Sequence, residues 1–270
     1  MNGYRFSGDM IHLFALVLLL FKLWIYKSAA GISGKMQILL ALVFTARYLD
    51  LFTNFVSAYN TEMKILYICL VYSTVLLIYT RFRKTYESHL DTLQIGFVIF
   101  ATLCLALVYN YDFTVVEVFW AFSQYLEAVA AWPQFFMIKK TKQVKTAVFV
   151  YLTALGLYRL MYIANWGYRY YLTDRYELLS VVPGGIQVLQ FLVFWVLCLT
   201  KVVTITSDKM SWFAKNLTQS DTNGIFVIQV PGGFDPKDAK LALIDHCEDA
   251  DQEAVATLTQ KQEMPTVHNT

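Results

Sequence analysis

Seven long apolar runs, separated by short charged clusters, constrain the fold of this 270-residue chain more than any other feature. They lie at roughly residues 10–26, 36–57, 62–80, 93–109, 114–138, 146–171 and 177–200. Each approaches the length that a helix needs to cross a bilayer, although the fourth is short. Because backbone polar groups in lipid must be satisfied within the segment, such runs predict helices. The sequence therefore predicts an all-α polytopic membrane protein with seven transmembrane helices.

Charge divides the chain into two parts. Residues 1–203 hold 17 Lys and Arg against 10 Asp and Glu, whereas residues 204–270 hold 5 against 10. The second part is polar and carries an acidic cluster near its end, which is typical of a disordered segment. We therefore expect a seven-helix membrane domain over residues 1–203, surrounded by lipid, and a mostly disordered cytoplasmic tail over residues 204–270.

Lysine and arginine in the short loops predict the orientation. The loops on one side hold nine of them, namely Lys27, Lys35, Arg81, Arg83, Lys84, Lys139, Lys140, Lys142 and Lys145. The loops on the other side offer Lys64 and Arg175. Since the more basic loops stay in the cytoplasm, we expect a lumenal or extracellular N-terminus and a cytoplasmic C-terminus.

The first run also has features of a signal peptide, because a basic residue precedes it and small residues follow it at positions 28–31. Lys22, Trp24 and Tyr26 are poor residues ahead of a cleavage site. We therefore favour a transmembrane helix.

A faint internal repeat supports the count of seven. The second run reads LVFTARYLDLFTNF and the sixth reads TALGLYRLMYIANW, and their alignment places Arg47 on Arg159. The first three and the last three runs are then two three-helix repeats joined by a linker helix. Pro133 and Gln134 predict a kink in the fifth run.

The sixth run carries a polar stripe. Tyr158, Tyr162, Asn165 and Arg169 recur at helical spacing and share one helix face. A guanidinium at bilayer depth is costly and needs a partner or a wet cavity, so this face is expected to point inward.

Three other runs carry polar faces of the same kind. Their members are Arg5, Asp9 and His12; Arg47, Asp50 and Asn54; and Glu117, Trp120, Gln124 and Glu127. One interpretation is that these charges only pair with each other, as Arg47 with Asp50 or Asp9 with Arg5. We favour the other, in which several converging polar faces line a wet binding site.

The side chains of that site suggest the chemistry of its ligand. Three guanidiniums suit carboxylates, two acids suit a cation, and an indole can stack on that cation. These groups are Arg5, Arg47 and Arg169; Asp50 and Glu117; and Trp120 or Trp166. A ligand with three carboxylates and one cation matches them.

His12 is a residue that can titrate between pH 5 and 8. Buried Glu127 is a candidate for a raised pKa and for a hydrogen bond with a tyrosine such as Tyr158. By contrast, we find no nucleophile–base pair, phosphate-binding loop or metal-ligand spacing, and the four cysteines have no CxxC pattern. We expect no enzyme activity, no cofactor, no metal and no nucleic-acid partner.

Four stretches resemble the KDEL receptor family, the ER lumen protein-retaining receptors. Residues 30–35 read AGISGK, 47–53 read RYLDLFT, 117–137 read EVFWAFSQYLEAVAAWPQFFM, and 155–171 read LGLYRLMYIANWGYRYY. The resemblance implies a seven-helix fold like that of the SWEET and PQ-loop transporters. It also implies a pH-dependent receptor in Golgi and endoplasmic reticulum membranes, which binds C-terminal KDEL or HDEL signals of escaped proteins and returns them through the COPI coat.

The resemblance implies roles for individual residues. Arg47 with Tyr48 would hold the terminal carboxylate of the signal, and Arg5 and Arg169 would hold its acidic side chains. Its basic side chain would face Asp50, Glu117 and Trp120. The pocket would be shaped by Tyr162, Asn165 and Trp166, and the pH switch would consist of His12, Tyr158 and Glu127. Acidic pH in the Golgi then favours binding, and neutral pH in the endoplasmic reticulum favours release.

The chain departs from the family in two places. Val193 stands where the family usually carries an acid. The family has a lysine cluster just after the last helix, where this chain keeps Lys201 but continues with Thr204, Thr206 and Ser207. Binding is expected to persist and sorting to differ. The alternatives are a small-solute transporter on the same fold and a receptor that binds the signal but stays in place.

Overall fold

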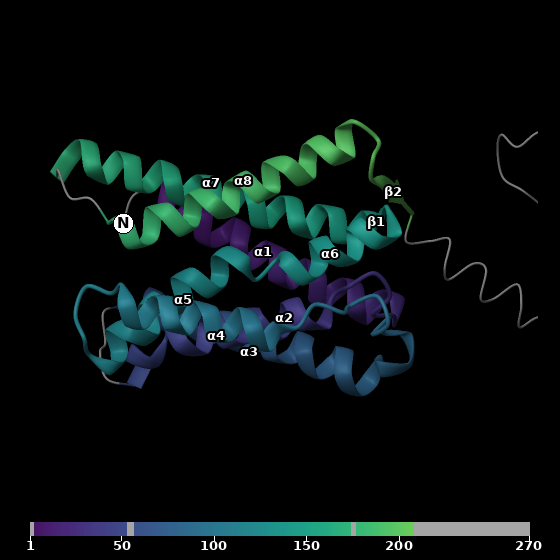
Figure 1. The fold of residues 1–270 in the computed structure, drawn as a ribbon, viewed down its shortest axis with the longest axis horizontal. Helices are drawn as coiled ribbons and strands as arrows, with labels where there is room; N and C mark the ends of the chain where they lie inside the picture. Colours follow the sequence, from purple (N-terminus) through teal and green to yellow (C-terminus); the bar gives the residue numbers. More distant parts are fainter. Residues whose placement is uncertain (1–2, 53–56, 174–176, 208–270) are drawn as a thin grey trace, which may run out of the picture. The chain divides into compact units, whose positions relative to one another are not determined.

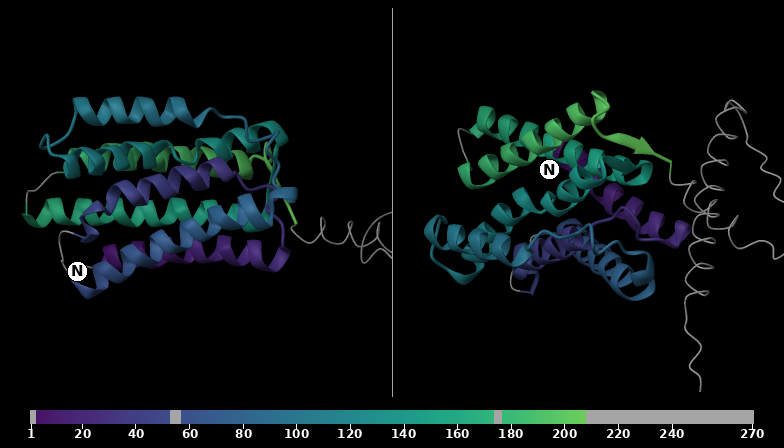
Figure 2. Two further views of the ribbon diagram at one scale, coloured as in Figure 1. Left: turned by 90° about the horizontal axis from the view of Figure 1, so that it is seen from below. Right: turned by 45° about the vertical axis from the view of Figure 1, so that its right-hand side comes forward.

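The structure, a computed structural model, describes residues 3–52, 57–173 and 177–207. These residues belong to one compact unit. Helices dominate it and run side by side along one direction (Figure 1; Figure 2).

The α-helices overlap the predicted runs, although α1 begins before its run and α2 ends before the end of its run. They are α1 Gly3–Tyr26, α2 Gly34–Arg47, α3 Ala58–Leu76, α4 Ile95–Val108, α5 Val115–Val129, α6 Trp132–Thr141, α7 Thr146–Thr173 and α8 Leu178–Leu199. Shorter turns follow α2 (η1, Leu49–Phe52) and α3 (η2, Leu77–Arg81; η3, Arg83–Thr85), and two short strands lie at β1 Gln143–Lys145 and β2 Thr204–Thr206.

Four of the helical segments in the described part are long and apolar enough to cross a membrane, namely Gly3–Tyr26, Ala58–Arg81, Thr146–Leu172 and Leu178–Leu199. Helix α4 is apolar but shorter. The protein is therefore a helical membrane protein, as predicted. The runs at 36–57 and 114–138 are not single long helices, so seven crossings and a three-plus-three repeat stay predictions.

The predicted run at 114–138 is divided by a break between α5 and α6. Pro133 lies in the first turn of α6, where its missing N–H costs nothing because the first amides of a helix have no intrahelical partner. The break separates Glu127, on α5, from Gln134, on α6, so that the two polar side chains serve different parts of the structure.

Helix packing buries one face of each helix and leaves apolar side chains on other faces exposed. Helix α1 lies along α7, α2 packs on α3 and α5, and α5 also contacts α4 and α8. Leu16, Leu19 and Phe44 are fully buried, whereas Trp24 and Phe97 are mostly exposed. Large exposed apolar side chains on long helices are what a lipid environment requires.

A polar cluster, here called the Asp91 hub, joins the loops at one end of the helices. One carboxylate oxygen of buried Asp91 accepts hydrogen bonds from Ser33 Oγ (2.8 Å), the Lys35 amide (3.0 Å) and the Tyr86 hydroxyl (2.7 Å). Burial, followed by this bond to the carboxylate, raises the pKa of the Tyr86 hydroxyl, which therefore stays a donor.

Gln134 completes the Asp91 hub from helix α6. Its amide nitrogen donates to the Gly31 carbonyl (3.0 Å), and its oxygen accepts from the Ser33 amide (2.8 Å). The loop before α2, the loop before α4 and the start of α6 are thus held together by bonds that mostly reach main-chain atoms.

A small parallel sheet lies at the same end as the Asp91 hub (Figure 1). The Thr204 amide donates to the Lys142 carbonyl (2.9 Å), after α8 has ended at Leu199 and Lys201 has adopted a left-handed conformation. The all-α prediction missed these strands, and the predicted tail boundary falls just before β2. The rest of the tail, from residue 208, lies outside the described residues.

Candidate functional site

A cavity of about 1010 Å³ opens among the helices at the end opposite the Asp91 hub. It is lined by all thirteen residues predicted for the ligand site and the pH switch: Arg5, His12, Arg47, Tyr48, Asp50, Glu117, Trp120, Glu127, Tyr158, Tyr162, Asn165, Trp166 and Arg169. The structure thus brings these side chains together, while their roles toward a ligand stay predictions. Lys201 and Val193 do not line this cavity and are exposed.

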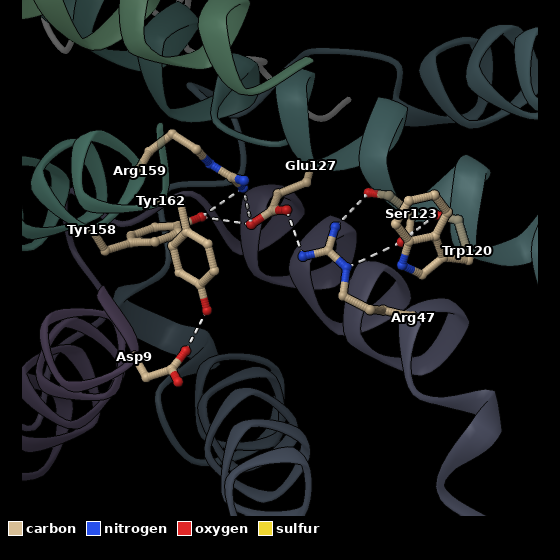
Figure 3. Close-up of polar contacts among 8 residues, drawn as sticks. All are labelled: Asp9, Arg47, Trp120, Ser123, Glu127, Tyr158, Arg159 and Tyr162. Carbon is tan, nitrogen blue, oxygen red and sulfur yellow. Dashed lines mark hydrogen bonds and ion pairs between the residues drawn. The ribbon is translucent and has the colours of Figure 1, made fainter. Parts of the chain in front are cut away.

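Helix α7 forms one wall of the cavity, as its polar stripe predicts. Tyr158, Tyr162, Asn165 and Arg169 all reach the cavity from the same face of α7. The Tyr162 hydroxyl donates to the carboxylate of Asp9 on α1 (Figure 3). The same carboxylate also accepts from the Tyr59 hydroxyl at 3.0 Å.

Glu127, on α5, is only 1% exposed. Its carboxylate lies 2.6 Å from Arg47 Nη1 and 2.5 Å from Arg159 Nη2 (Figure 3). Tyr158 donates its hydroxyl hydrogen to the same carboxylate at 2.5 Å, which confirms the predicted bond. One acid thus faces two guanidiniums, so this cluster carries an excess of positive charge.

Arg47 is fixed by α5. Its Nε donates to Ser123 Oγ at 3.1 Å, and its Nη2 donates to the Ser123 carbonyl at 3.2 Å. The suggested pair of Arg47 with Asp50 is wrong, because the structure pairs Arg47 with Glu127 and Asp50 with Lys64. The guanidinium is held in one orientation at the cavity wall.

Lys64 corrects the sequence analysis, which placed this residue in a loop. It lies on α3, is 8% exposed, and lines the cavity. Its Nζ is 2.9 and 2.8 Å from the two carboxylate oxygens of Asp50, and 5.8 Å from the centre of the Tyr48 ring. This ammonium therefore sits beside two of the predicted ligand-binding residues.

His12 is enclosed by aromatic rings. Its imidazole stacks on Tyr158, with ring centres 4.0 Å apart and planes at 2°, and lies 4.9 Å from Tyr67 and 5.5 Å from Phe44. Within the described residues, its buried Nε2 has no hydrogen-bond partner. A buried nitrogen of this kind is an acceptor for a proton or for a donor from a ligand.

The first turn of α5 and the ends of α7 and α8 also line the cavity. Glu117 Oε1 is buried without a hydrogen-bond partner in the part of the chain that the structure describes. Trp120 lies one turn further along α5, and its ring stacks near Tyr111. Arg169 pairs with Glu177 at 3.2 Å, and both side chains are more than a third exposed.

Sequence reasoning left out several residues that the structure brings to the site. They include Lys64, Tyr67, Ser123, Arg159 and Glu177. Arg159 entered the sequence analysis only through its alignment with Arg47 in the internal repeat. Lys64 had a readable signal, because Met63 and Ile65 flank it and a lysine between apolar residues can be buried with a partner.

The fold and the cavity define a helical membrane protein with a charged, partly buried binding site. The family described as "ER lumen protein retaining receptor" matches residues 28–169, just over half of the chain. The chain belongs to this family, as its resemblance predicted.

Similarity to individual relatives extends beyond that segment. Over 203 residues, 75% of this chain, it is 50% identical to "ER lumen protein-retaining receptor 3" of Xenopus tropicalis, of which 95% is covered. Over the same length it is 49% identical to "ER lumen protein-retaining receptor 2" of Gallus gallus and 48% identical to that of Bos taurus, each covered to 96%.

Proposed function

We propose that this protein is a pH-dependent receptor for the C-terminal KDEL or HDEL signal of escaped proteins of the endoplasmic reticulum. The names of its relatives, retaining receptors of the ER lumen, support this function over the small-solute transporter. A family of receptors also fits the expectation that the protein is not an enzyme.

The observation that carries the proposal is a match of lengths along α5. The Arg47 guanidinium is bound at the level of Ser123, and Glu117 lies six residues earlier, about 9 Å along the helix axis. In an extended peptide, the fourth residue from the carboxyl end lies about 10 Å from the last one. A tetrapeptide can therefore reach from Arg47, with its terminal carboxylate, to Glu117, with its basic side chain.

The other charged groups complete the peptide site. Arg5 and Arg169 are proposed to bind the two acidic side chains of the signal. Arg169 is available at little cost, because its pair with Glu177 is more than a third exposed and such pairs are weak.

Uncharged groups are proposed to shape the pocket around the same peptide. Tyr162, Asn165 and Trp166 line the α7 wall, Tyr48 stands beside Arg47, and Trp120 lies near Glu117 for stacking on the ligand's cation.

His12 supplies the proposed pH dependence. Protonation of His12 adds positive charge to a cavity that also contains Arg47 and Arg159, which favours a ligand with three carboxylates. Loss of that proton at neutral pH removes the added attraction. His12 stacks on Tyr158, and Tyr158 bonds to Glu127, so a change in the charge of His12 acts on the charged cluster at short range.

The proposed topology places the cavity on the lumenal side. The basic loops lie at the end of the Asp91 hub, which the positive-inside rule assigns to the cytoplasm. We propose seven crossings, with α2–η1 and α5–α6 as two of them, in two three-helix repeats joined by α4. The N-terminus is then lumenal in Golgi and endoplasmic reticulum membranes, and residues 204–270 are the cytoplasmic tail of a membrane domain ending at 203.

Retrieval through the COPI coat is the proposed route of return, with Lys201 as the remaining basic sorting residue. Lys201 is exposed just after α8, where a cytoplasmic coat can reach it. The neutral Thr204 and Thr206 that follow make this contact weaker than a lysine cluster provides.

The test is binding of a labelled Lys-Asp-Glu-Leu peptide to purified protein at about pH 5.4 and about pH 7.4, which bracket the unperturbed pKa of histidine. We expect tight binding at acidic pH, weak binding at neutral pH and loss of binding in Arg47→Ala. Arg81→Ala, an exposed arginine at the other end, is the matched control. Absence of binding by folded protein at both pH values, or substrate flux into vesicles, would refute the receptor.

A further inference from the structure

We infer that Lys64 is a specificity-determining residue of the peptide site, which sets how strongly the protein selects a cation at the fourth residue from the ligand's C-terminus. This inference rests on the proposed function. Lys64 lines the cavity, but none of the roles proposed above for binding the ligand's charged groups involves it.

The geometry places Lys64 on one of the two acids assigned to the ligand's cation. Its ammonium bonds both carboxylate oxygens of Asp50, at 2.9 and 2.8 Å. The Lys64 side chain is 10% exposed and that of Asp50 is 30% exposed, so water screens the pair only in part. Lys64 therefore already supplies the charge that a ligand cation would bring to Asp50.

Glu117 differs from Asp50 in this respect. It lies on α5, against which η1 and its Asp50 pack, and both acids line the same cavity. Yet Glu117 Oε1 is buried without a hydrogen-bond partner among the described residues, whereas both oxygens of Asp50 are bound by Lys64. Two acids thus line this part of the cavity, and Lys64 neutralises one of them.

The consequence is a graded preference. With Lys64 in place, the field at the fourth residue is that of about one carboxylate, so a neutral polar residue is disfavoured only moderately. Without Lys64, two carboxylates face that residue, and a cation is selected much more strongly. Lys64 thereby widens the set of signals that the receptor accepts.

The experiment compares two labelled peptides, Lys-Asp-Glu-Leu and Gln-Asp-Glu-Leu, at about pH 5.4, a value below the histidine pKa. The readout is the ratio of their dissociation constants, neutral over cationic. In Lys64→Met we expect this ratio to rise about tenfold, because Lys64 no longer neutralises the charge of Asp50 beside the ligand. Lys64→Arg keeps the charge and should leave the ratio close to that of the unmodified protein.

Asp50 variants close the comparison. In Asp50→Asn the unpaired ammonium faces the ligand, and the ratio should fall below that of the unmodified protein. In the double variant Asp50→Asn, Lys64→Met both charges are gone, and the ratio should return close to its starting value. Asp50→Asn also keeps the inference testable if Lys64→Met does not fold.

Equal ratios in the unmodified protein, Lys64→Met and Asp50→Asn would overturn the inference, provided that each variant binds the cationic peptide. Lys139→Met, an exposed lysine at the other end of the helices, is the matched control and should change nothing. If the unmodified protein binds neither peptide, the proposed function itself fails, which is a separate result.

Discussion

The two ends of the helices differ in what their polar groups bind. At the cavity end, charged side chains pair with other side chains, as Glu127 with Arg47 and Asp50 with Lys64. At the Asp91 hub, bonds from Asp91 and Gln134 also reach main-chain atoms of residues 31–35, as from Gln134 to Gly31. Side-chain pairs can exchange for a ligand, whereas main-chain bonds are lost only when a loop opens. The same kinds of chemical group thus form ion pairs around a cavity at one end and anchor loops at the other.

The largest expected effect comes from breaking the charge cluster of the cavity. Glu127→Gln leaves the guanidiniums of Arg47 and Arg159 without their shared counter-ion, and breaking a buried pair costs about 3–5 kcal/mol of unfolding free energy. Thermal unfolding in detergent measures this loss. The control is Glu62→Gln, an exposed acid on α3, and equal melting temperatures in the two variants would contradict the prediction.

A smaller effect is expected from breaking the Asp91 hub. Asp91→Ala removes the acceptor of three hydrogen bonds and should lower stability by about 2–3 kcal/mol. Because the Asp91 hub lies at the end opposite the cavity, peptide affinity should stay within about twofold of the unmodified protein. A loss of affinity that follows the loss of stability would show that the two ends are not independent.

Binding of the peptide at the cavity end is also expected to depend on pH. Peptide affinity should fall about tenfold between pH 5.4 and pH 7.4, because His12 loses the proton that attracts the ligand's carboxylates. In His12→Ala the affinity should be low and nearly constant over this range. His89→Ala, at an exposed histidine in the loop before α4, should keep the full pH dependence. A flat profile in the His89 variant, or a steep one in the His12 variant, would contradict this assignment.

The smallest effect is expected where the cavity meets solvent. Glu177→Gln removes an exposed partner of Arg169, so stability should change by less than about 1 kcal/mol. Affinity for the peptide should rise by about twofold at low salt, since the ligand no longer competes with Glu177 for Arg169. Thermal unfolding measures the change in stability, and peptide titrations at two salt concentrations measure the change in affinity. A weaker affinity in Glu177→Gln would show that Glu177 contacts the ligand instead.

Hydropathy and helical spacing predicted the approximate positions of the helices and most of the residues that share the cavity, whereas Tyr48 came from the family resemblance. The stripe of α7 is the clearest case, because a polar face in an apolar run leaves few alternatives. The pairing of individual charged side chains could not be predicted in the same way. Arg47 and Glu127 are 80 positions apart, and only the packing of α2 on α5 decides that they meet.

Errors arose where local patterns are ambiguous. Lys64 lies at the start of an apolar run, where a lysine can equally belong to the loop or to the helix. The strands β1 and β2 are three residues each and pair across 61 positions, so the strands are too short for a hydrophobic periodicity to predict them. The break at Pro133 was readable because proline cannot continue the hydrogen-bond pattern of the preceding helix.

The pairing of β1 with β2 closes the chain into a loop that contains both α7 and α8. These two helices carry Tyr162, Arg169 and Ser180 to the cavity. Backbone hydrogen bonds fasten the pair at one end, while the other end borders the space for the ligand. The β1–β2 pairing therefore fixes the start of α7 against the segment that follows α8, so that one helix cannot slide along the other without breaking backbone hydrogen bonds.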